Sequence, residues 1–424
     1  MDTLPPSCDV AIVGAGAAGL AAAIFALRSN RSRSIILLDG ARRPGAKILV
    51  SGGTRCNVTN VTVTERDFWG GRATIIRRVL RAFPVPDTVA FFRDIGVPLH
   101  EEADGKLFPD SHRARDVLDA LLREATAVGA TLAAGHRVLG VERSADGFRV
   151  VTDRGDLRAG AVVLATGGQS LPKTGSDGAG LAIAKLLGHT IVPTTPALDP
   201  LVLDRDDRVH AELSGVSQDV ELAVWIDGAV ALRLTGALLW THFGVSGPVA
   251  LNASRHWLRA RLEGRAVSIT ANLRPGQRLD QVGAQWVSLA RDHPKASVQK
   301  TLAAMVPASV ATVLLRELGI DGNVAHLSRD DRRRLSRALV EWPLPVVGTR
   351  GYDYAEATAG GVALTQIDPA TMQSRVCPGL FLVGEMLDVD GRLGGFNFQW
   401  AWSSGFVAGR ALGKEAASAG AQRV

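Results

Sequence analysis

Short apolar runs and one longer, helix-like segment alternate over the first forty residues of the chain. Asp9 to Val13 and Ser34 to Leu38 are short runs dominated by aliphatic residues, and the Ala- and Leu-rich segment 17–27 between them has helical length. Continuous apolar runs of about five residues are typical of strands that a parallel sheet buries on both faces. The pattern therefore predicts a strand–helix–strand unit at the start of the chain.

The turn between the first run and the helix has the sequence GAGAAG, residues 14–19. Gly14 permits the tight turn, Gly16 lets the backbone approach a pyrophosphate, and Gly19 lets the helix lie close to the strand. The helix N-terminus adds N–H groups and a partial positive charge that favour phosphates. Asp39 follows the second run, at a position where a carboxylate accepts hydrogen bonds from ribose hydroxyls. An acid here favours FAD or NAD over NADP.

Three later stretches favour FAD over NAD. The segment 42–60 carries Gly52-Gly53 and small polar residues where a nicotinamide-dependent dehydrogenase usually continues into another helix. Two further apolar strands are followed by small or acidic residues, Ala165-Thr166-Gly167 after one and Gly384-Glu385 after the other. Ligands of doubly wound sheets bind at such strand ends. A cofactor contacted from residue 14 and again near residue 395 must be long, which indicates FAD in an extended pose.

A dense group of glycines and aromatic residues, GRLGGFNFQWAWSSG, occupies residues 391–405. We expect Gly394-Gly395 to bring the N-terminus of the last helix against the isoalloxazine ring. There the helix dipole and its N–H groups stabilise negative charge on the reduced flavin. Phe396 is expected beside the ring, and Trp400 and Trp402 are expected to fill the core.

The middle of the chain has a different pattern. Short alternating apolar runs such as 220–226 indicate antiparallel strands, and the charged stretch 276–340 has long helical periods. The predicted fold class is α/β: a discontinuous Rossmann-type FAD-binding domain with an inserted β-rich, barrel-like domain and a helical insertion. The predicted boundaries are 1–193 and 361–424 for the FAD-binding domain, 194–275 and 341–360 for the β-rich substrate domain, and 276–340 for the helical insertion. The sequence has no second GxGxxG motif, so no dedicated nicotinamide domain is expected.

Composition and charge are those of an ordinary soluble protein, with 46% apolar and 21% charged residues. The pI is 9.6, but the net charge of +6 is modest for 424 residues. The densest basic run, 332–334, follows two aspartates and is typical of a solvated helix face, so a nucleic-acid partner is not expected. Cys8, Cys56 and Cys377 have neither metal-ligand nor disulfide spacing, which predicts no metal site and a reducing, cytoplasmic setting. No apolar run reaches the ~20 residues of a membrane span.

Together these motifs resemble one known group. The chain is similar to bacterial two-dinucleotide-binding-domain flavoproteins, described as the aminoacetone oxidase family or as NAD(P)/FAD-dependent oxidoreductases, a group that includes a bile-acid ene reductase. The resemblance covers nearly the full length through GAGAAG, KILVSGGTRCNVTN, KLFPDS, ATGGQSLPKTGSDG, THFGVSGP, TAGGV and GE…LGGFNFQWAWSSGFVAG. It implies an FAD-dependent oxidoreductase.

The motifs and the resemblance together imply a set of FAD-lining residues. Two positions depart from the family pattern: Asp39 stands where Glu is usual, and Thr54 replaces a third glycine before Arg55. Covalent attachment of FAD usually uses a His, Cys or Tyr beside the ring. Cys56 is the only plausible one here and is expected to be a packed residue, so FAD is expected to be bound non-covalently. The implied set is Gly14, Ala15, Gly16, Gly19, Asp39, Gly40, Lys47, Gly52, Gly53, Arg55, Cys56, Asn57, Ala165, Thr166, Gly167, Gly384, Glu385, Gly394, Gly395, Phe396 and Asn397.

Two residues are candidates for catalysis. His242, in THFGVSGP, has an ordinary pKa suited to proton transfer, and it could equally support the following turn. Arg392, in GRLGG, is similar to the arginine with which fumarate-reductase-type flavoproteins hold a substrate carboxylate; a phosphate or solvent role is the alternative. Cys56 is expected to be a small packed residue rather than a redox thiol, and His112 is expected at the surface.

The sequence therefore predicts an FAD-dependent oxidoreductase that transfers hydride between flavin N5 and a small organic substrate at the interface of the FAD and β-rich domains. An ene reductase with NAD(P)H as transient reductant is the preferred type, and an FAD-dependent amine oxidase that uses oxygen is the alternative. An RNA-associated or non-catalytic flavoprotein is the alternative from another class. The sequence carries no signal for the oligomeric state.

Overall fold

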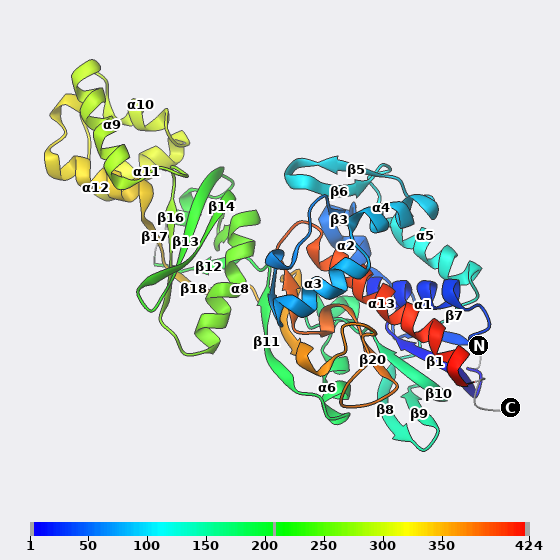
Figure 1. Ribbon diagram of the computed structural model, residues 1–424. Helices are drawn as coiled ribbons and strands as arrows, with labels where there is room; N and C mark the ends of the chain where they lie inside the picture. Colours follow the sequence, from blue (N-terminus) through cyan, green and yellow to red (C-terminus); the bar gives the residue numbers. More distant parts are fainter. Residues whose placement is uncertain (1–3, 207–208, 420–424) are drawn as a thin grey trace. The chain divides into compact units, whose positions relative to one another are not determined.

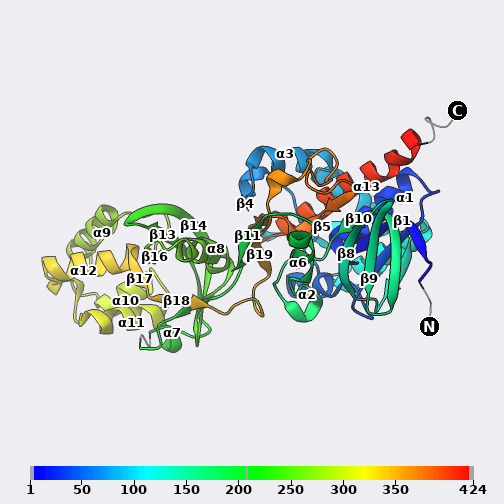
Figure 2. The same ribbon diagram turned by 90° about the horizontal axis from the view of Figure 1, so that it is seen from below.

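The computed structural model describes residues 4–206 and 209–419, which belong to two compact units. The first unit combines residues 1–196 with 356–424, and we call it the discontinuous unit. The second is the continuous segment 197–355, the inserted unit. Figures 1 and 2 show the elements of both.

Within the described residues, the discontinuous unit is built on a seven-stranded sheet of order β7-β2-β1-β10-β9-β8, in which β20 also pairs with β10. The strands β7, β2, β1, β10 and β20 pair with one another in parallel, and β9 pairs antiparallel with both β10 and β8. The apolar runs predicted as strands lie in β1 and β2 and are buried, as expected for strands covered on both faces. The predicted Rossmann-type fold is confirmed. The bounds are β1 Ser7–Val13, β2 Ile35–Asp39, β7 Thr131–Ala134, β8 Val138–Ser144, β9 Gly147–Thr152, β10 Gly155–Leu164 and β20 Leu380–Leu382.

Helices α1 (Ala17–Ser29) and α13 (Phe396–Ala419) lie side by side, although they come from opposite ends of the chain (Figure 1). The helix α13 presents Gly405, Gly409 and Gly413 to α1 at intervals of four residues, which places them on one helix face. A Cβ at Gly405 would lie 2.6 Å from Ala18 O, and one at Gly409 would lie 2.6 Å from Ala22 O. Because these neighbours are backbone atoms, only glycine permits so close a packing.

Shorter elements surround this core. Strands form three small sheets, β3-β6-β5, β21-β4 and β11-β19. The helices are α2 Ala46–Thr54, α3 Ala73–Ala82, α4 Val85–Asp94, α5 Ala114–Ala127 and α6 Ala179–Leu186, with short 3₁₀ turns η1 Glu65–Asp67, η2 Ala103–Gly105, η3 Pro172–Thr174, η5 Leu364–Gln366 and η6 Gly384–Met386. The strands are β3 Thr59–Asn60, β4 Phe68–Gly70, β5 Leu99–Glu102, β6 Lys106–Pro109, β11 Ile191–Ala197, β19 Ala357–Val362 and β21 Val389–Gly391.

The inserted unit contains the expected antiparallel sheet. Over residues 197–206 and 209–355 its seven strands have the order β17-β16-β13-β14-β15-β12-β18. The two ends of this order, β17 and β18, are consecutive along the chain and separated by Pro345 alone. The bounds are β12 Leu201–Leu203, β13 Ser217–Ile226, β14 Ala229–Thr241, β15 Gly244–Ser246, β16 Val267–Asn272, β17 Trp342–Leu344 and β18 Val346–Thr349, with helices α7 Val209–Glu212 and α8 Pro248–Leu262.

The charged stretch after β16 is helical and packs on this sheet. Its elements are α9 Leu279–Asp292, α10 Val298–Ala303, α11 Ala308–Leu318, η4 Val324–His326 and α12 Arg329–Val340. Trp286 and Leu335 are fully buried and join the same apolar core as Leu222 and Val224 of the sheet. The helices and the sheet of the inserted unit are therefore one folded body.

Candidate functional site

Four parallel strands of the discontinuous unit end at the same edge of its sheet. Gly14 follows β1, Asp39 is the last residue of β2, Ala165 follows β10, and Gly384 lies two residues after β20. Backbone hydrogen bonds hold the strand ends together, from Gly14 N to Leu38 O at 2.8 Å and from Ala165 N to Val13 O at 2.8 Å. Doubly wound sheets bind their ligands at this edge.

The three glycines of the first turn occupy three different environments. Gly14 has a φ of +103°, and a Cβ there would lie 2.5 Å from Ala165 O. A Cβ at Gly19 would overlap the carbonyl oxygen of Gly14, so this glycine is needed for the close approach of α1 to β1. A Cβ at Gly16 would meet no atom within 4 Å. The protein itself thus has no packing reason for glycine at position 16, which fits a residue kept small for a ligand.

Asp39 contacts this turn with one carboxylate oxygen and the chain after β2 with the other. Oδ2 accepts a hydrogen bond from Ala15 N at 2.9 Å, and Oδ1 accepts one from Ala41 N at 2.8 Å. Gly40 lies between these contacts, with the Arg137 side chain 3.3 Å from the position of a Cβ. Each carboxylate oxygen can accept more than one hydrogen bond, so Asp39 can brace the turn and bind ribose hydroxyls at the same time.

We expect Asp39→Ala to weaken FAD binding by about 1.5–3 kcal/mol, the range for hydrogen bonds to a charged group. Asp39→Asn should lose less, because its amide oxygen still accepts from one backbone N–H. Titration of the apoproteins with FAD, followed by flavin fluorescence, measures both losses. An Asp39→Ala protein that binds FAD as tightly as the wild type would remove this residue from the site.

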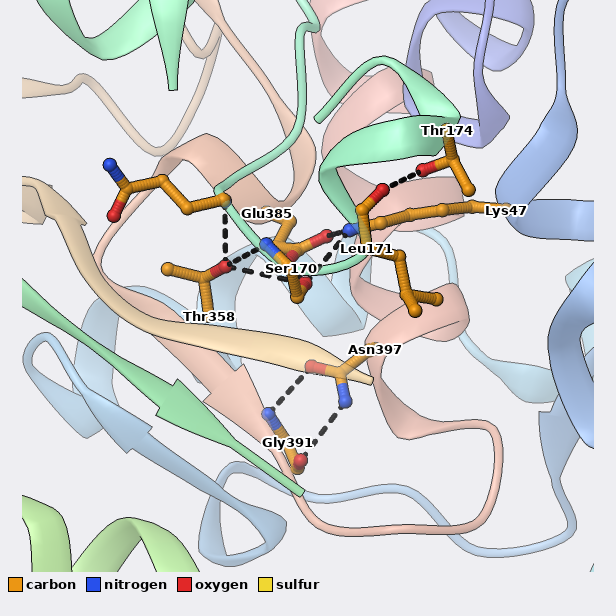
Figure 3. A network of polar contacts seen from close by, with 9 residues as sticks. Lys47, Ser170, Leu171, Thr174, Thr358, Glu385, Gly391 and Asn397 are labelled. Atoms are coloured by element: carbon orange, nitrogen blue, oxygen red, sulfur yellow. Dashed lines mark hydrogen bonds and ion pairs between the residues drawn. The ribbon is translucent and has the colours of Figure 1, made fainter. Parts of the chain in front are cut away.

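A partly buried polar network connects α2 with the strand ends, although its members are far apart in the sequence (Figure 3). Lys47 Nζ lies 2.5 Å from Glu385 Oε2 and 3.0 Å from Ser170 Oγ. Ser170 Oγ donates to Glu385 Oε1 at 2.8 Å. Thr358 Oγ1 accepts from the backbone N–H groups of Gln169 and Ser170 at 2.8 and 3.1 Å. Both oxygens of Glu385 are therefore engaged, and the network fixes the segment after β10 against η6.

The end of α2 and the residues that follow it have an unusual backbone. Gly52, Gly53 and Thr54 have φ values of +54°, +66° and +69°, and Cys56 follows at +64°. A Cβ at Gly52 would lie 2.9 Å from both Asn57 N and a Phe108 ring carbon, whereas one at Gly53 would meet no atom within 4 Å. Left-handed backbone at non-glycine residues is costly and concentrates at functional sites.

Cys56 and Arg55 differ in their exposure. Cys56 is fully buried, and burial raises the pKa of its thiol to about 12. The thiol therefore stays protonated near neutral pH, which suits a packed residue and not a redox nucleophile. Arg55 lies with its guanidinium 4.2 Å from the centre of the Phe108 ring and 2.6 Å from Glu102 Oε1.

The start of α13 is fixed to this segment. Gly395 has a φ of +89°, and a Cβ there would lie 2.5 Å from the backbone of Thr59. The Asn57 amide, oriented to satisfy both of its ends, donates to Thr59 O at 2.9 Å and accepts from Gly395 N at 3.1 Å. Asn397 donates to Gly391 O at 3.0 Å and accepts from Gly391 N at 2.8 Å, which closes the loop before the helix (Figure 3).

Phe396, Trp400 and Trp402 of α13 are buried, and the two tryptophans also hold the loops around them. Trp400 Nε1 donates to Gly384 O at 3.1 Å, and Trp402 Nε1 donates to Val58 O at 2.9 Å. Ser404 Oγ accepts from Gly384 N at 3.0 Å. Phe396 is 1% exposed, and its ring packs edge-on against Phe68. These side chains anchor the backbone segments that the FAD motifs occupy.

Thr166 and Gly167 lie at the end of β10 under α6. A Cβ at Gly180 of α6 would overlap Thr166 Oγ1, so this side chain lies against the helix. Gly167 has a φ of +73°, and a Cβ there would lie 2.5 Å from Ser176 Oγ. The backbone of this segment, and not the Thr166 side chain, is the part that would face a cofactor.

The two catalytic candidates lie in different units. Arg392 Nε lies 2.8 Å from Asp67 Oδ1, and the guanidinium covers the Phe396 ring at 4.4 Å. A partner and a stacking surface are therefore already supplied to Arg392 by its own unit. His242 is exposed on the loop between β14 and β15, with its ring 5.1 Å from that of Phe243.

The inserted unit also contains a buried acid that the sequence analysis did not single out. Asp199 is fully buried, its Oδ2 accepts from Gly351 N at 2.7 Å, and burial raises its pKa to about 6. The folded protein holds this proton more tightly than the unfolded chain does. The contribution of protonated Asp199 to the free energy of unfolding is therefore fully present below about pH 4 and is lost as the pH rises through about 6.

We expect Asp199→Asn to melt like the wild type at pH 4 and to be more stable by about 2–3 kcal/mol at pH 7. Equal melting temperatures at pH 7 would contradict this.

The residues at the sheet edge fit FAD. The position of Gly16 accommodates a phosphate at the N-terminus of α1, whose N-cap has no side-chain hydrogen bond to the first-turn N–H groups. Asp39 offers the acceptor for ribose, and Gly53 leaves room beside the strained segment. The N-terminus of α13 supplies a second set of N–H groups.

Comparison with known proteins agrees with this geometry. A family model described as the HI0933-like protein Rossmann domain matches residues 8–411. The chain belongs to the HI0933-like family. Two curated relatives in this family are a 3-dehydro-bile acid delta(4,6)-reductase of Clostridium scindens, 33% identical, and a ribosomal RNA dihydrouridine synthase of Escherichia coli, 34% identical. Each alignment covers 95% of this chain and 98% of the relative. This HI0933-like chain is accordingly an FAD-dependent oxidoreductase.

Solved structures show the same fold. FrdA of Escherichia coli quinol fumarate reductase matches 97% of this chain and 71% of its own length with a TM-score of 0.52 and 18% identity. A quinol–fumarate reductase with bound menaquinol molecules matches with a TM-score of 0.51 and 17% identity, over 98% of this chain and 72% of its own. Among the described residues of this family member, no helix combines the length and apolarity needed to cross a bilayer.

Proposed function

We propose that this protein is a reductase of carbon–carbon double bonds that are conjugated to a carbonyl group. The observation that carries the proposal is the complete dinucleotide cradle of Gly14, Gly16, Gly19 and Asp39 in a chain that aligns end to end with two reducing enzymes. A 3-dehydro-bile acid with delta(4,6) unsaturation and a uridine base share one feature: each presents a double bond conjugated to a carbonyl. Reduction of either bond requires a hydride at one carbon and a proton at the other.

The residues of the discontinuous unit bind and orient the cofactor for this chemistry. Bound FAD supplies the hydride-transferring isoalloxazine ring. Gly16 and the N-terminus of α1 hold the pyrophosphate, and Asp39 holds the adenosine ribose. The paired Lys47 and Glu385 keep α2 and η6 in place, and the N-terminus of α13 directs N–H groups at negative charge on the ring. NAD(P)H is the proposed transient reductant, and it would have to reach the flavin directly, because the sequence has no second GxGxxG fingerprint.

His242, with its exposed imidazole on the loop between β14 and β15, is the candidate proton donor. His242→Ala should lower kcat by roughly 10²–10⁴-fold if it donates the proton, with FAD content unchanged.

Arg392→Ala should raise KM without a comparable loss in kcat if the arginine only binds substrate. It should lower the melting temperature if the arginine only braces Asp67.

One observation favours ribosomal RNA as the substrate class over a small sterol-like molecule. The segment 276–340 contains ten Lys and Arg and six Asp and Glu, so most of the net charge of +6 resides there. Such an excess attracts a phosphate backbone and makes binding depend on salt. This candidate departs from the sequence-based expectation of no nucleic-acid partner.

The test uses the purified holoprotein under anaerobic conditions. Bleaching of the flavin by NADH or NADPH supports the reductase, whereas peroxide produced from amines in air, without bleaching by either nucleotide, supports the amine oxidase. The reduced protein is then offered two substrates in separate reactions: a 3-oxo-4,6-diene steroid, and ribosomal RNA from a strain that lacks the gene for this protein. Mass spectrometry measures the reduced steroid in the first reaction and dihydrouridine in the second. A protein that is bleached but reduces neither compound would refute both substrate classes.

A further inference from the structure

A cluster of two histidines and a glutamate lies on the hairpin of β5 and β6 and plays no part in the function proposed above. His100 and Glu102 are two residues apart in β5, so their side chains project from the same face of the strand. His112 reaches this face from the turn after β6, where its φ is +52°. Left-handed backbone is rare at a non-glycine residue and costs free energy unless the surroundings require it.

We propose that His100, Glu102 and His112 form a binding site for a divalent transition metal of the Zn²⁺ type. Their ligand atoms all lie within 4.8 Å of one another, with His100 Nε2 3.4 Å and His112 Nδ1 3.7 Å from Glu102 Oε1. Ligands placed about 2.1 Å from a tetrahedral Zn²⁺ lie about 3.4 Å from each other. The two nitrogen–oxygen distances are therefore close to those of an assembled site.

A fourth residue orients the first histidine. Asp110 Oδ1 lies 3.1 Å from His100 Nδ1, where it can accept a hydrogen bond from a protonated Nδ1 and leave Nε2, which faces Glu102, to bind a metal. Metal-binding histidines usually have such a carboxylate on the other ring nitrogen. The His100 and His112 rings meet edge-on with centres 4.6 Å apart, so neither ring blocks the other.

The site is open on one side and has an internal competitor. The side chains of His100 and Glu102 are about 30% exposed and that of His112 is 55% exposed, which leaves an entry path and a position for a water ligand. Arg55 Nη1 lies 2.6 Å from the same Glu102 oxygen. Cysteine spacing carries no signal of this cluster, whereas the pattern H-x-E at residues 100–102, followed by His112, points to it.

The proposal predicts that chelator-treated holoprotein binds one Zn²⁺ in titration calorimetry. His100→Asn, Glu102→Gln and His112→Asn should each weaken binding at least tenfold, and Asp110→Asn should weaken it by a smaller factor, about tenfold at most. His326→Asn is the matched control, because His326 is also exposed and lies outside the cluster. It should bind Zn²⁺ as the wild type does.

Co²⁺ provides a readout that a merely ionic cluster would not give. The wild-type protein should show the intense visible bands of low-coordinate Co²⁺, and the His112→Asn protein should lack them. Arg55→Gln should tighten Zn²⁺ binding, because it removes a cation from the Glu102 oxygen. Absence of Zn²⁺ binding, or equal affinity of the wild type and the three ligand variants, would overturn the proposal; circular dichroism confirms that each variant is folded.

Discussion

Replacing Gly16 with alanine weakens FAD binding while the apoprotein keeps its fold. The backbone at Gly16 has a φ of −85° and a ψ of −168°, which any residue adopts, and a Cβ there meets no protein atom within 4 Å. The added methyl group projects into the position that a pyrophosphate requires. Overpacking of this kind costs about 1–3 kcal/mol, which corresponds to roughly ten- to hundredfold weaker FAD binding. Loss of a good N-cap residue should cost the apoprotein no more than about 1 kcal/mol.

Gly19→Ala is the matched control for this prediction. It adds the same methyl group three residues away, but the new Cβ would overlap the carbonyl oxygen of Gly14. The apoprotein itself should therefore be destabilised, in addition to any loss of FAD. Melting curves of both apoproteins, combined with FAD titration, separate the two effects. A Gly16→Ala protein that retains FAD at wild-type affinity would show that the pyrophosphate lies elsewhere.

Gly409→Ala should destabilise the discontinuous unit by about 1–3 kcal/mol. A Cβ at this position would lie 2.6 Å from Ala22 O and 2.9 Å from Ala26 N, so α13 and α1 must move apart to admit it. The expected loss in melting temperature is about 2–4 °C for each kcal/mol in a unit of this size. Alanine normally stabilises a helix relative to glycine, so a destabilising effect of this substitution would come from the contact with α1.

The control for Gly409 is the same substitution in another helix. Gly283 lies inside α9, and the nearest atom to a Cβ there is Ser336 Oγ at 4.0 Å. Gly283→Ala should therefore stabilise the inserted unit by about 0.5–1 kcal/mol, the usual gain from replacing a helical glycine. Opposite signs for the two substitutions are expected in thermal unfolding. Stabilisation by Gly409→Ala would show that the two helices are not in backbone contact.

The sequence predicted the parts of the fold whose cause is local. The turn 14–19 could be interpreted because each glycine answers a constraint within one strand–turn–helix unit, and β1 and β2 followed from uninterrupted apolar runs. The Lys47–Glu385 pair could not be derived, because its members are far apart in the sequence and nothing local links them. Ser170 and Thr358 were missed for the same reason.

The aromatic residues near the C-terminus show a second kind of limit. Trp400 and Trp402 were expected to fill the core, and both are buried, but the hydrogen bonds from their Nε1 atoms to Gly384 O and Val58 O depend on tertiary neighbours. The Arg392 contact with Asp67 is likewise invisible to a motif that covers only residues 391–395. Motifs identify the residues of a site, whereas the partners that hold them come from the rest of the fold.

The pairing of α1 with α13 has a consequence for synthesis on the ribosome. The nascent chain carries α1, complete at Ser29, long before α13 begins at Phe396. During that time the Ala18–Ala22–Ala26 face lacks the helix that covers it, while the inserted unit, being continuous, can already fold. A prematurely terminated message would therefore yield a chain with a folded middle and an exposed apolar helix at its start, which is the kind of surface that chaperones and proteases recognise.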